Sequence, residues 1–479
     1  MLKVIYDLPA AGPTPFDELD DNGVYSISGL RRAISTSYTI ENQTINIIMK
    51  NTTGYWYNLL KSDDRYLKGR AIAVFNDDQL LGTFYIYDFA PSNEAYFTIK
   101  ADTFTGIDYP LAPTITKASY NNAPDANIGK SINIIAGTLS DAGWKNAGQC
   151  IAYRVDANRF LAACHHLKTI PTGQVYDKTG AVQTFTIDNN ADGYCYINCT
   201  STETELYFNC QGLIDDNGDL ITNPAYILQE IISRFTSLSI SATNIQDAAA
   251  KYTSKSFIDN AILITSETTK AFFQKFSKNY LTYIYPGADG VYYPKVHDYN
   301  ETAPVKTFEE AFVRNLKLNY DPKNIISAVR RQYYSHYRQN TFFYSPLEQS
   351  VTSWIGGILD LDLTYHRGNE GSLNTVNYYL FYRSKPEETI TFDVFTNQIT
   401  IDIGAKIAFQ HDTGFRAGET RQYRVMKIEN AETGFARITA MDIDSEAQGG
   451  ITLLDETDDL VTLLYAENDP LCAILFFDI

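Results

Sequence analysis

The feature that most constrains the fold is a series of short apolar segments, separated by turns rich in Asn, Asp and Gly, over residues 24–105. The segments cover residues 44–49, 71–75, 81–87 and 96–99. Short strands at this spacing fit a small barrel or sandwich. The chain also holds 35 Tyr and 26 Phe, residue types that suit half-buried pleated surfaces. The sequence therefore predicts a small β-barrel in this region.

A second β-rich region follows a proline-rich boundary. The boundary is marked by Asn121 and Asn122 and by three prolines, Pro110, Pro113 and Pro124. Beyond it, strand-like segments are expected at residues 132–135, 150–154, 184–187, 193–197 and 205–209. The run Asp215-Asp216-Asn217-Gly218 then predicts a tight turn.

The hydrophobic period changes from strand to helix at Asn223-Pro224, a capping residue before a proline at the first helical position. Apolar residues then recur at helical spacing, at Ile227, Leu228, Ile231, Ile232 and Phe235. A second helix is expected over 244–252, and a third after Ser266 with an apolar side made of Ala271, Phe272, Phe276 and Tyr280. A hairpin is expected over 281–293, and Thr307 with Glu310 predicts a capping box before another short helix. Residues 222–300 are thus predicted to form an α+β insert.

Residues 350–445 return to strand-like segments, with a helix expected near 373–382, and the last β region resembles the first. In order along the chain, residues 69–75 parallel 404–410, residues 84–87 parallel 423–426, and residues 95–102 parallel 434–441. The second copy is longer in the loop 410–422, where insertions are tolerated. The alternative is that any two β-meanders share such short-range order. If the repeat is real, three chains would present six similar barrels in a closed ring.

Net charge and cysteine content exclude several classes of protein. The formal net charge is −18, which argues against stable nucleic-acid binding, because Lys and Arg supply most of that affinity. The acidity fits a solvated surface, or an acidic lining past which DNA slides. We expect no secretory signal and no membrane span. The six cysteines do not predict a disulfide framework: Cys150, Cys164, Cys195, Cys199, Cys210 and Cys472.

Two motifs suggest ligand chemistry and have simpler explanations. Gly129-Lys130-Ser131 would need a glycine at position 124 to complete a phosphate loop, and that residue is Pro124, so a turn into a strand is expected. Cys164-His165-His166 could supply metal ligands or a nucleophile with its base. No CxxC pair supports zinc, and neighbouring residues of a strand point to opposite faces. We therefore expect buried structural cysteines and surface histidines.

Acidic pairs and aromatic runs allow further interpretations. Asp215-Asp216 and Glu309-Glu310 could serve a glycosidase, but adjacent acids in turns and first helical turns are normally capping or solvated. Calcium at Asp215, Asp216 and Asn217 would lack the spaced ligand loop. The aromatic runs at 333–337 and 342–344 could stack on sugars, although strand cores and subunit contacts use such residues more often.

A set of landmarks occurs in order over most of residues 25–445. They are Gly29-Leu30-Arg31-Arg32, the strand 45–51, Leu81-Gly82-Thr83, the segment 128–137, Gln174-Val175-Tyr176-Asp177, and the segments 220–225 and 402–407. In this order the chain resembles the hub proteins of phage tails, both baseplate hubs of contractile tails and the hub part of siphophage tail-tip proteins. It departs from the family at Ala405, where an acidic residue is usual after Gly404.

The resemblance implies a structural virion protein at the tail tip. It implies a homotrimeric baseplate hub that adapts the six-fold tail tube to a three-fold spike or fibre and closes the DNA channel. The implied partners are the tail tube or distal tail protein, the central spike or fibre and the tape measure protein, with DNA passing through during ejection. Two other functions remain open, a receptor- or carbohydrate-binding tail protein and a tail-associated cell-wall hydrolase.

The expected fold is mainly β with an α+β insert, in which two similar small β-barrels flank a second β domain and an α+β module. The expected division is a first hub β-barrel over 1–110, an inserted β domain over 111–220, an α+β module over 221–345, a second hub β-barrel with a helix over 346–445, and a C-terminal extension over 446–479. The extension ends in the apolar run 471–477, expected to be a barrel strand or subunit contact. No catalytic, cofactor-binding or metal-binding residue and no cofactor is expected, and the chain is predicted not to be an enzyme.

Overall fold

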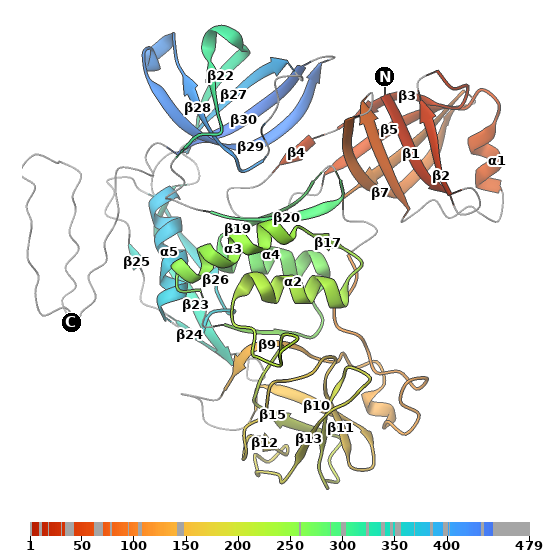
Figure 1. Cartoon of the computed structure of the whole chain (residues 1–479), viewed down its shortest axis with the longest axis vertical. Helices are drawn as coiled ribbons and strands as arrows, with labels where there is room; N and C mark the ends of the chain where they lie inside the picture. The colour runs from red at the N-terminus through yellow and green to blue at the C-terminus, as the bar shows by residue number, and fades with distance from the viewer. Residues whose placement is uncertain are drawn as a thin grey trace, which may run out of the picture. The chain divides into compact units, whose positions relative to one another are not determined.

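The structure is a computed structural model of the chain (Figure 1). It describes residues 2–8, 12–17, 19–29, 31–33, 43–61, 70–76, 79–93, 95–103, 108–140, 148–257, 260–287, 289–297, 303–321, 325–336, 341–344, 348–349, 356–367, 369–383, 387–395, 401, 403–432 and 435–443. These residues fall into two compact units, which are described one at a time. The first unit comprises segments 1–297, 332–343 and 363–372, and the second comprises 298–331, 344–362 and 373–479. Strands outnumber helices, which confirms the predicted mainly β fold.

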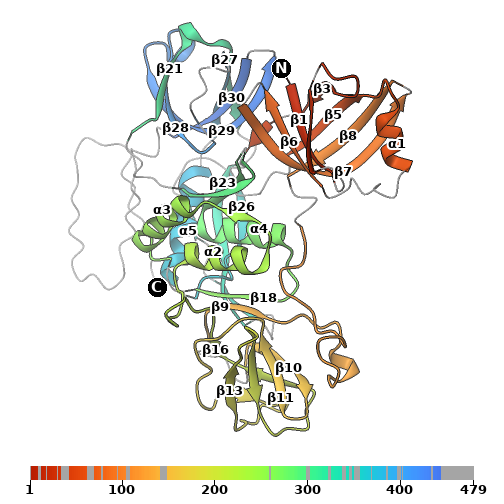
Figure 2. The same cartoon turned by 45° about the vertical axis from the view of Figure 1, so that its right-hand side comes forward.

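The first sheet of unit 1 is strongly curved (Figures 1 and 2). Across the sheet its seven strands are β2 (Gly12–Asp17), β1 (Leu2–Leu8), β6 (Ala71–Asn76), β7 (Gln79–Asn93), β8 (Tyr96–Asp102), β5 (Thr44–Lys50) and β3 (Val24–Ser28). Only residues 18–23 join the edge strands β2 and β3, a reach of about 25 Å at most. A flat sheet of this size would be about 29 Å wide. The short connection therefore requires the sheet to curl.

The core of this sheet comes from alternate residues of each strand, as a period of two requires. In β5 and β8 the inward residues are Ile45, Ile47, Met49, Phe97, Ile99 and Ala101, all buried. Helix α1 (Tyr55–Lys61) adds Trp56, whose ring stacks on Phe97 with centroids 5.7 Å apart. The Trp56 indole N–H donates to the backbone oxygen of Asn22 at 3.0 Å. The sequence predicted β5 to β8 but not β1 and β2, and the family landmark 29–32 overlaps the three-residue strand β4 (Arg31–Ala33).

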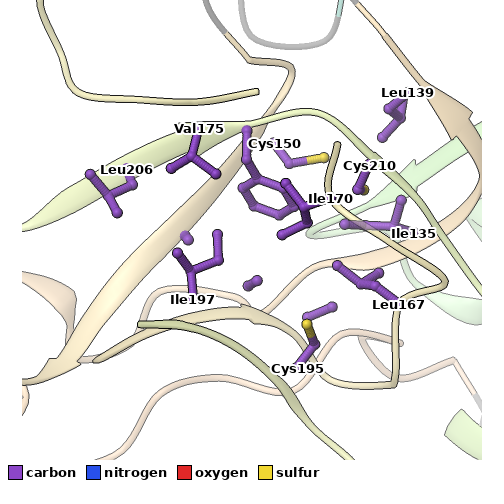
Figure 3. Close-up of a cluster of buried hydrophobic side chains, with 14 of the residues drawn as sticks. Ile135, Leu139, Cys150, Leu167, Ile170, Val175, Cys195, Ile197, Leu206 and Cys210 are labelled. Atoms are coloured by element: carbon purple, nitrogen blue, oxygen red, sulfur yellow. The ribbon is translucent and has the colours of Figure 1, made fainter. Parts of the chain in front are cut away.

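A separate antiparallel sheet follows the proline-rich boundary. Its six strands are, in order, β12 (Val175–Tyr176), β15 (Glu205–Phe208), β10 (Cys150–Asp156), β11 (Arg159–Ala163), β14 (Cys195–Asn198) and β13 (Thr186–Asn189). Figure 3 shows its core, where aliphatic side chains such as Val175, Ile197 and Leu206 surround three cysteines. Each buried aliphatic side chain contributes roughly 2 kcal/mol. A 3₁₀ turn, Asp125–Asn127, lies in the linker before this sheet.

Helices α2 (Pro224–Phe235), α3 (Ala242–Ser254) and α4 (Thr269–Tyr280) lie side by side and confirm the three predicted helices (Figures 1 and 2). Two small sheets accompany the helices. The first consists of β16 (Cys210–Gln211), β9 (Ile134–Leu139) and β18 (Ala261–Ile264), and the second of β17 (Ser239–Ile240), β20 (Val291–Val296) and β19 (Thr282–Pro286). Asn223 caps α2, since its side-chain oxygen accepts the N–H of Ala225 at 3.0 Å. In α4, Ala271 is exposed and Phe273 is buried, because the buried face is rotated from the predicted Ala271 side toward Phe273.

A distant segment of the chain, 363–367, returns to unit 1 and is held there by buried polar groups. The backbone N–H of Tyr365 donates to the side-chain oxygen of Asn279 at 3.1 Å, and the Nε2–H of His366 donates to the Asn279 carbonyl at 2.7 Å. The backbone N–H of Ala261 donates to the Tyr365 carbonyl at 3.0 Å. Because these groups are buried, losing one partner leaves the other unsatisfied at a cost of about 1–3 kcal/mol.

Unit 2 contains a second curved sheet. Its main path is β21 (Lys306–Glu309), β28 (Lys406–Gln410), β29 (Thr420–Glu432), β30 (Phe435–Asp442), β27 (Glu387–Phe395) and β22 (Arg314–Asp321). The edge strands β21 and β22 are separated only by the 3₁₀ turn Glu310–Phe312 and Val313, so this sheet must also curl. A second 3₁₀ turn, Gly414–Arg416, lies in the loop after β28. Of the remaining elements, β25 (Glu348–Gln349) and β26 (Gly357–Asp362) lie in unit 2, and β24 (Thr341–Tyr344) lies almost wholly in unit 1. Strand β23 (Ile326–His336) and helix α5 (Asn369–Arg383) contribute residues to both units, and α5 confirms the helix expected near 373–382.

The two curved sheets share one strand order. We call the curved sheet of unit 1 sheet 1 and the curved sheet of unit 2 sheet 2. The order β6-β7-β8-β5 in sheet 1 corresponds to β28-β29-β30-β27 in sheet 2. The register agrees with the alignment made from the sequence. Ile72 pairs with Phe84 as Ile407 pairs with Tyr423, and Tyr85 pairs with Asp102 as Arg424 pairs with Met441. The structure extends the match to a further strand, since Ile99 pairs with Ile47 as Ile438 pairs with Phe392. A register shift follows at matching points, Ile86/Asp88 and Val425/Lys427. Two β-meanders of unrelated design need not share a bulge position, so the predicted repeat is confirmed.

One predicted helix is wrong. Residues 306–309 form β21, which pairs in parallel with β28, and only a single 3₁₀ turn follows. Thr307 and Glu310 do not form a capping box, since the turn begins after Glu309 and has no side-chain cap. Tertiary pairing with β28 supplies hydrogen bonds that a short isolated helix would lack.

Candidate functional sites

The Gly129-Lys130-Ser131 segment is a turn into a strand, as predicted. Gly129 has φ +82°, and its N–H donates to the Ile115 carbonyl at 2.8 Å. Ser131 forms an isolated bridge with Thr114, and β9 begins three residues later. The backbone N–H groups of Gly129 and Lys130 are thus engaged with the protein's own carbonyls, so the segment is not arranged to cradle phosphate.

His165 is buried, which corrects the expectation of two surface histidines. Its Nε2 accepts the N–H of Ile135 at 2.9 Å, and its Nδ1–H donates to the His166 carbonyl at 2.8 Å. Burial lowers the pKa of His165 to about 4, so the ring is neutral at pH 7. His166 is half-buried and its Nε2–H donates to the Asn190 carbonyl at 2.7 Å. The two rings therefore bind different parts of the chain. Sequence periodicity could not predict that His165 is buried in the core.

The five described cysteines are buried free thiols, as expected: Cys150, Cys164, Cys195, Cys199 and Cys210. Burial raises the pKa of Cys164 and of Cys195 to about 12. Because the thiolate is the reactive form, these groups are poor nucleophiles and poor metal ligands. Within the described ranges, no group of three or more His, Cys, Asp or Glu side chains is arranged to hold a metal ion. No described helix has the length and apolar character needed to cross a membrane.

The acidic pairs are used in turns and loop contacts. Asp215 Oδ1 accepts the N–H groups of Asn217 and Asp219 at 2.9 and 2.8 Å, which closes the predicted turn and lowers the Asp215 pKa. Glu310 Oε2 accepts the N–H groups of Asp412 and Thr413 at 2.8 and 3.0 Å. Its hydrogen bond with the Thr413 hydroxyl and these backbone bonds lower the Glu310 pKa. One carboxylate of each pair, that of Asp215 and that of Glu310, therefore has a structural partner.

The predicted aromatic run at 333–344 falls mostly outside the residues whose side chains the structure describes. Two other aromatic pairs occur at matching ends of the two curved sheets. Tyr25 and Tyr96 lie with ring centroids 4.7 Å apart, and Phe395 and Phe435 with centroids 4.5 Å apart. Tyr96 and Phe435 are equivalent in the repeat, since each begins the last strand of its sheet. Tyr25 and Phe395 are exposed by 56% and 50%, a feature common at subunit interfaces.

An open groove of about 560 Å³ lies in unit 1. Its walls are the linker before the second β domain, the turn before β14 and the end of α2. The lining side chains include Tyr109, Asp192, Tyr194, Arg234, Phe235 and Leu238. This mixture of rings with a few polar groups is typical of small-molecule sites. The residues come from segments widely separated in sequence, so no sequence motif identified the groove.

The fold defines a mainly β protein with an internally duplicated curved sheet. No known family model matches the chain, and no curated protein matches its sequence. Among solved structures, it is similar to a tail protein from Neisseria meningitidis, with 11% identity, TM-score 0.40 and coverage of 93% of this chain and 98% of that one. It is also similar to a prophage tail protein from Listeria monocytogenes, with 9% identity, TM-score 0.41 and coverage of 92% and 94%. A prophage tail protein from Shewanella oneidensis matches at 10% identity and TM-score 0.44, with coverage of 93% and 99%.

Proposed function

We propose that this chain is a structural component of a virus tail tip, a homotrimeric baseplate hub that adapts the six-fold tail tube to a three-fold spike or fibre and closes the DNA channel. The duplicated curved sheet carries the proposal. Each chain holds two copies with the same strand order, the same register and the same bulge position. Three chains related by a closed three-fold axis would therefore present six similar surfaces to a six-fold tube.

The two exposed aromatic pairs support this use of the repeat. Tyr96 and Phe435 begin corresponding strands, whereas Tyr25 lies on β3 and Phe395 on β27, the counterpart of β5. A trimer would therefore carry six aromatic pairs, each built around an equivalent ring. In sheet 2, the Arg314 guanidinium lies 4.4 Å from the centre of the Phe435 ring, a cation–π contact that fixes the pair. Aromatic and arginine side chains dominate the binding energy of many interfaces. We propose these pairs as contacts with neighbouring chains or with the tail tube.

The proposed partners are the tail tube or distal tail protein, a central spike or fibre, and the tape measure protein. The net charge of −18 suits a channel component, because like charges keep DNA from adhering during ejection. The proposed location is the tail tip of the virion, and the proposed role is assembly and closure of the channel, without catalysis.

Mass photometry of the purified protein, together with a cryo-EM map of the virion tail tip, tests the proposal. The expected result is a species of three times the chain mass and density for three copies around the tail axis. A chain that stays monomeric at micromolar concentration and is absent from purified tails would refute it.

A further inference from the structure

We propose that the groove in unit 1 binds a carbohydrate, with Asp192 as its fixed acceptor and Tyr109 as an aromatic platform. The volume of about 560 Å³ accommodates a few sugar residues. The groove combines an exposed ring, that of Tyr109, with a preorganised polar group, the carboxylate of Asp192. It is a binding site in addition to the proposed structural function and does not depend on it.

Asp192 is an exposed residue whose carboxylate is nevertheless held in place. Its Oδ1 accepts the N–H of Tyr194 at 3.0 Å, and its Oδ2 accepts the hydroxyl of Tyr196 at 2.9 Å. Each carboxylate oxygen has a second lone pair, so both can still accept a ligand hydroxyl. Two adjacent hydroxyls of a sugar can donate to such a carboxylate together. The Asp192 side chain is already ordered, so binding costs less conformational entropy than it would for a freely rotating surface aspartate.

The groups behind Asp192 form a second layer that keeps it there. The Tyr120 hydroxyl lies 3.2 Å from that of Tyr196, and the Arg159 guanidinium lies 3.7 Å from the centre of the Tyr196 ring. Arg159 is held in turn by Asp188, with Nη2 2.8 Å from Oδ2. Burial raises the pKa of Tyr196, which therefore stays a neutral donor to Asp192.

The rings and donors of the groove favour a sugar over other ligands. Tyr109 is 64% exposed, and Tyr194 and Phe235 are half-buried in the same lining. The C–H face of a pyranose packs on such rings, while its hydroxyls reach polar groups at the rim. Arg234 also lines the groove, but its Nε lies 2.5 Å from Glu230 Oε2 and its Nη2–H donates to the Ile214 carbonyl at 3.3 Å. Because Asp192 adds a negative charge to the lining, the groove offers no net positive charge to a phosphate or sulfate.

The test is an array of neutral and acidic oligosaccharides probed with the full-length protein, followed by titration of the retained glycan. We expect Tyr109→Ala to weaken binding at least tenfold, since it removes the platform from an exposed position without disturbing the core. Asp192→Ala is expected to weaken it similarly. Tyr226→Ala is the matched control, because Tyr226 is a 43% exposed tyrosine on α2 that does not line the groove.

Several results would overturn the proposal. An array with no retained glycan would do so, as would glycan binding that Tyr109→Ala leaves unchanged. Retention limited to sulfated glycans and abolished by high salt would assign the signal to general charge attraction. Failure of the trimer test would leave this outcome intact, since binding is read out from a groove that lies within one chain.

Discussion

Acidification should destabilise the second β domain through one buried imidazole, His165. The ring is 2% exposed and accepts the Ile135 N–H, a bond that joins the loop after β11 to strand β9. If Nε2 were protonated, it would become a second N–H donor of the ring and would face the N–H of Ile135, so the hydrogen bond would be lost. Burial therefore disfavours the charged form and lowers the pKa from 6.5 to about 4.

The sign and size of the effect follow from linkage. A histidine whose folded pKa is depressed contributes stability that is complete above the unfolded pKa and is lost as pH falls. The loss begins near pH 6.5 and levels off near pH 4. One pH unit corresponds to about 1.4 kcal/mol, so the loss reaches about 2 kcal/mol at pH 5 and about 3 kcal/mol at pH 4. At pH 5 the local opening constant should rise about 20-fold.

Two measurements check this. In protein labelled at histidine Cε1, the signal that disappears in His165→Gln should keep its neutral shift down to pH 5. Hydrogen exchange of the β9 amides, corrected for intrinsic rates, should show the 20-fold change between pH 7 and 5 in the wild type and a smaller change in His165→Gln. A His165 signal that titrates near 6.5, or equal pH slopes in both proteins, would refute the reasoning.

Three further predictions concern backbone geometry, capping and assembly. Gly137→Ala should destabilise unit 1 by more than about 2 kcal/mol, because Gly137 has φ +73° and a Cβ would overlap the Asn260 carbonyl. Gly129→Ala is the control, because Gly129 has φ +82° but no atom near the added Cβ. Urea unfolding should show a smaller loss of stability for Gly129→Ala than for Gly137→Ala. Asn223→Ala should cost at least about 1 kcal/mol, because it removes the α2 cap and also the side-chain N–H that donates to the Ala249 carbonyl at 2.9 Å. Asn223→Asp keeps the cap acceptor but turns an oxygen toward that carbonyl, so it should recover only part of the loss in thermal unfolding; equal melting of all three proteins would contradict the capping role. The double variant Tyr25→Ala with Phe395→Ala should lower the trimer fraction in mass photometry, with an unchanged far-UV circular dichroism spectrum. The control Tyr226→Ala should leave the trimer fraction unchanged. An unaltered trimer fraction in the double variant would show that the aromatic pairs are not part of the interface.

Features that depend on neighbours in sequence were predictable. Asn223 and Pro224 start α2 because a cap and a fixed φ act within one turn, and the period of apolar residues orients the helix. The repeat was predictable for a related reason. Inward residues of a strand recur every second position, so Ile72 and Ile407 could be aligned before their pairing partners were known.

Only the tertiary structure determined which side chains from distant parts of the chain lie close together. His165 lies in a segment of ordinary strand pattern, and its burial depends on packing against β9, about 30 residues earlier. Glu310 was expected to start a helix, yet its carboxylate binds a loop about 100 residues later. The groove likewise joins Tyr109, Asp192 and Arg234. Sequence determines local preference and face, because those forces act over a few residues, whereas burial and convergent side chains arise only when the chain closes on itself.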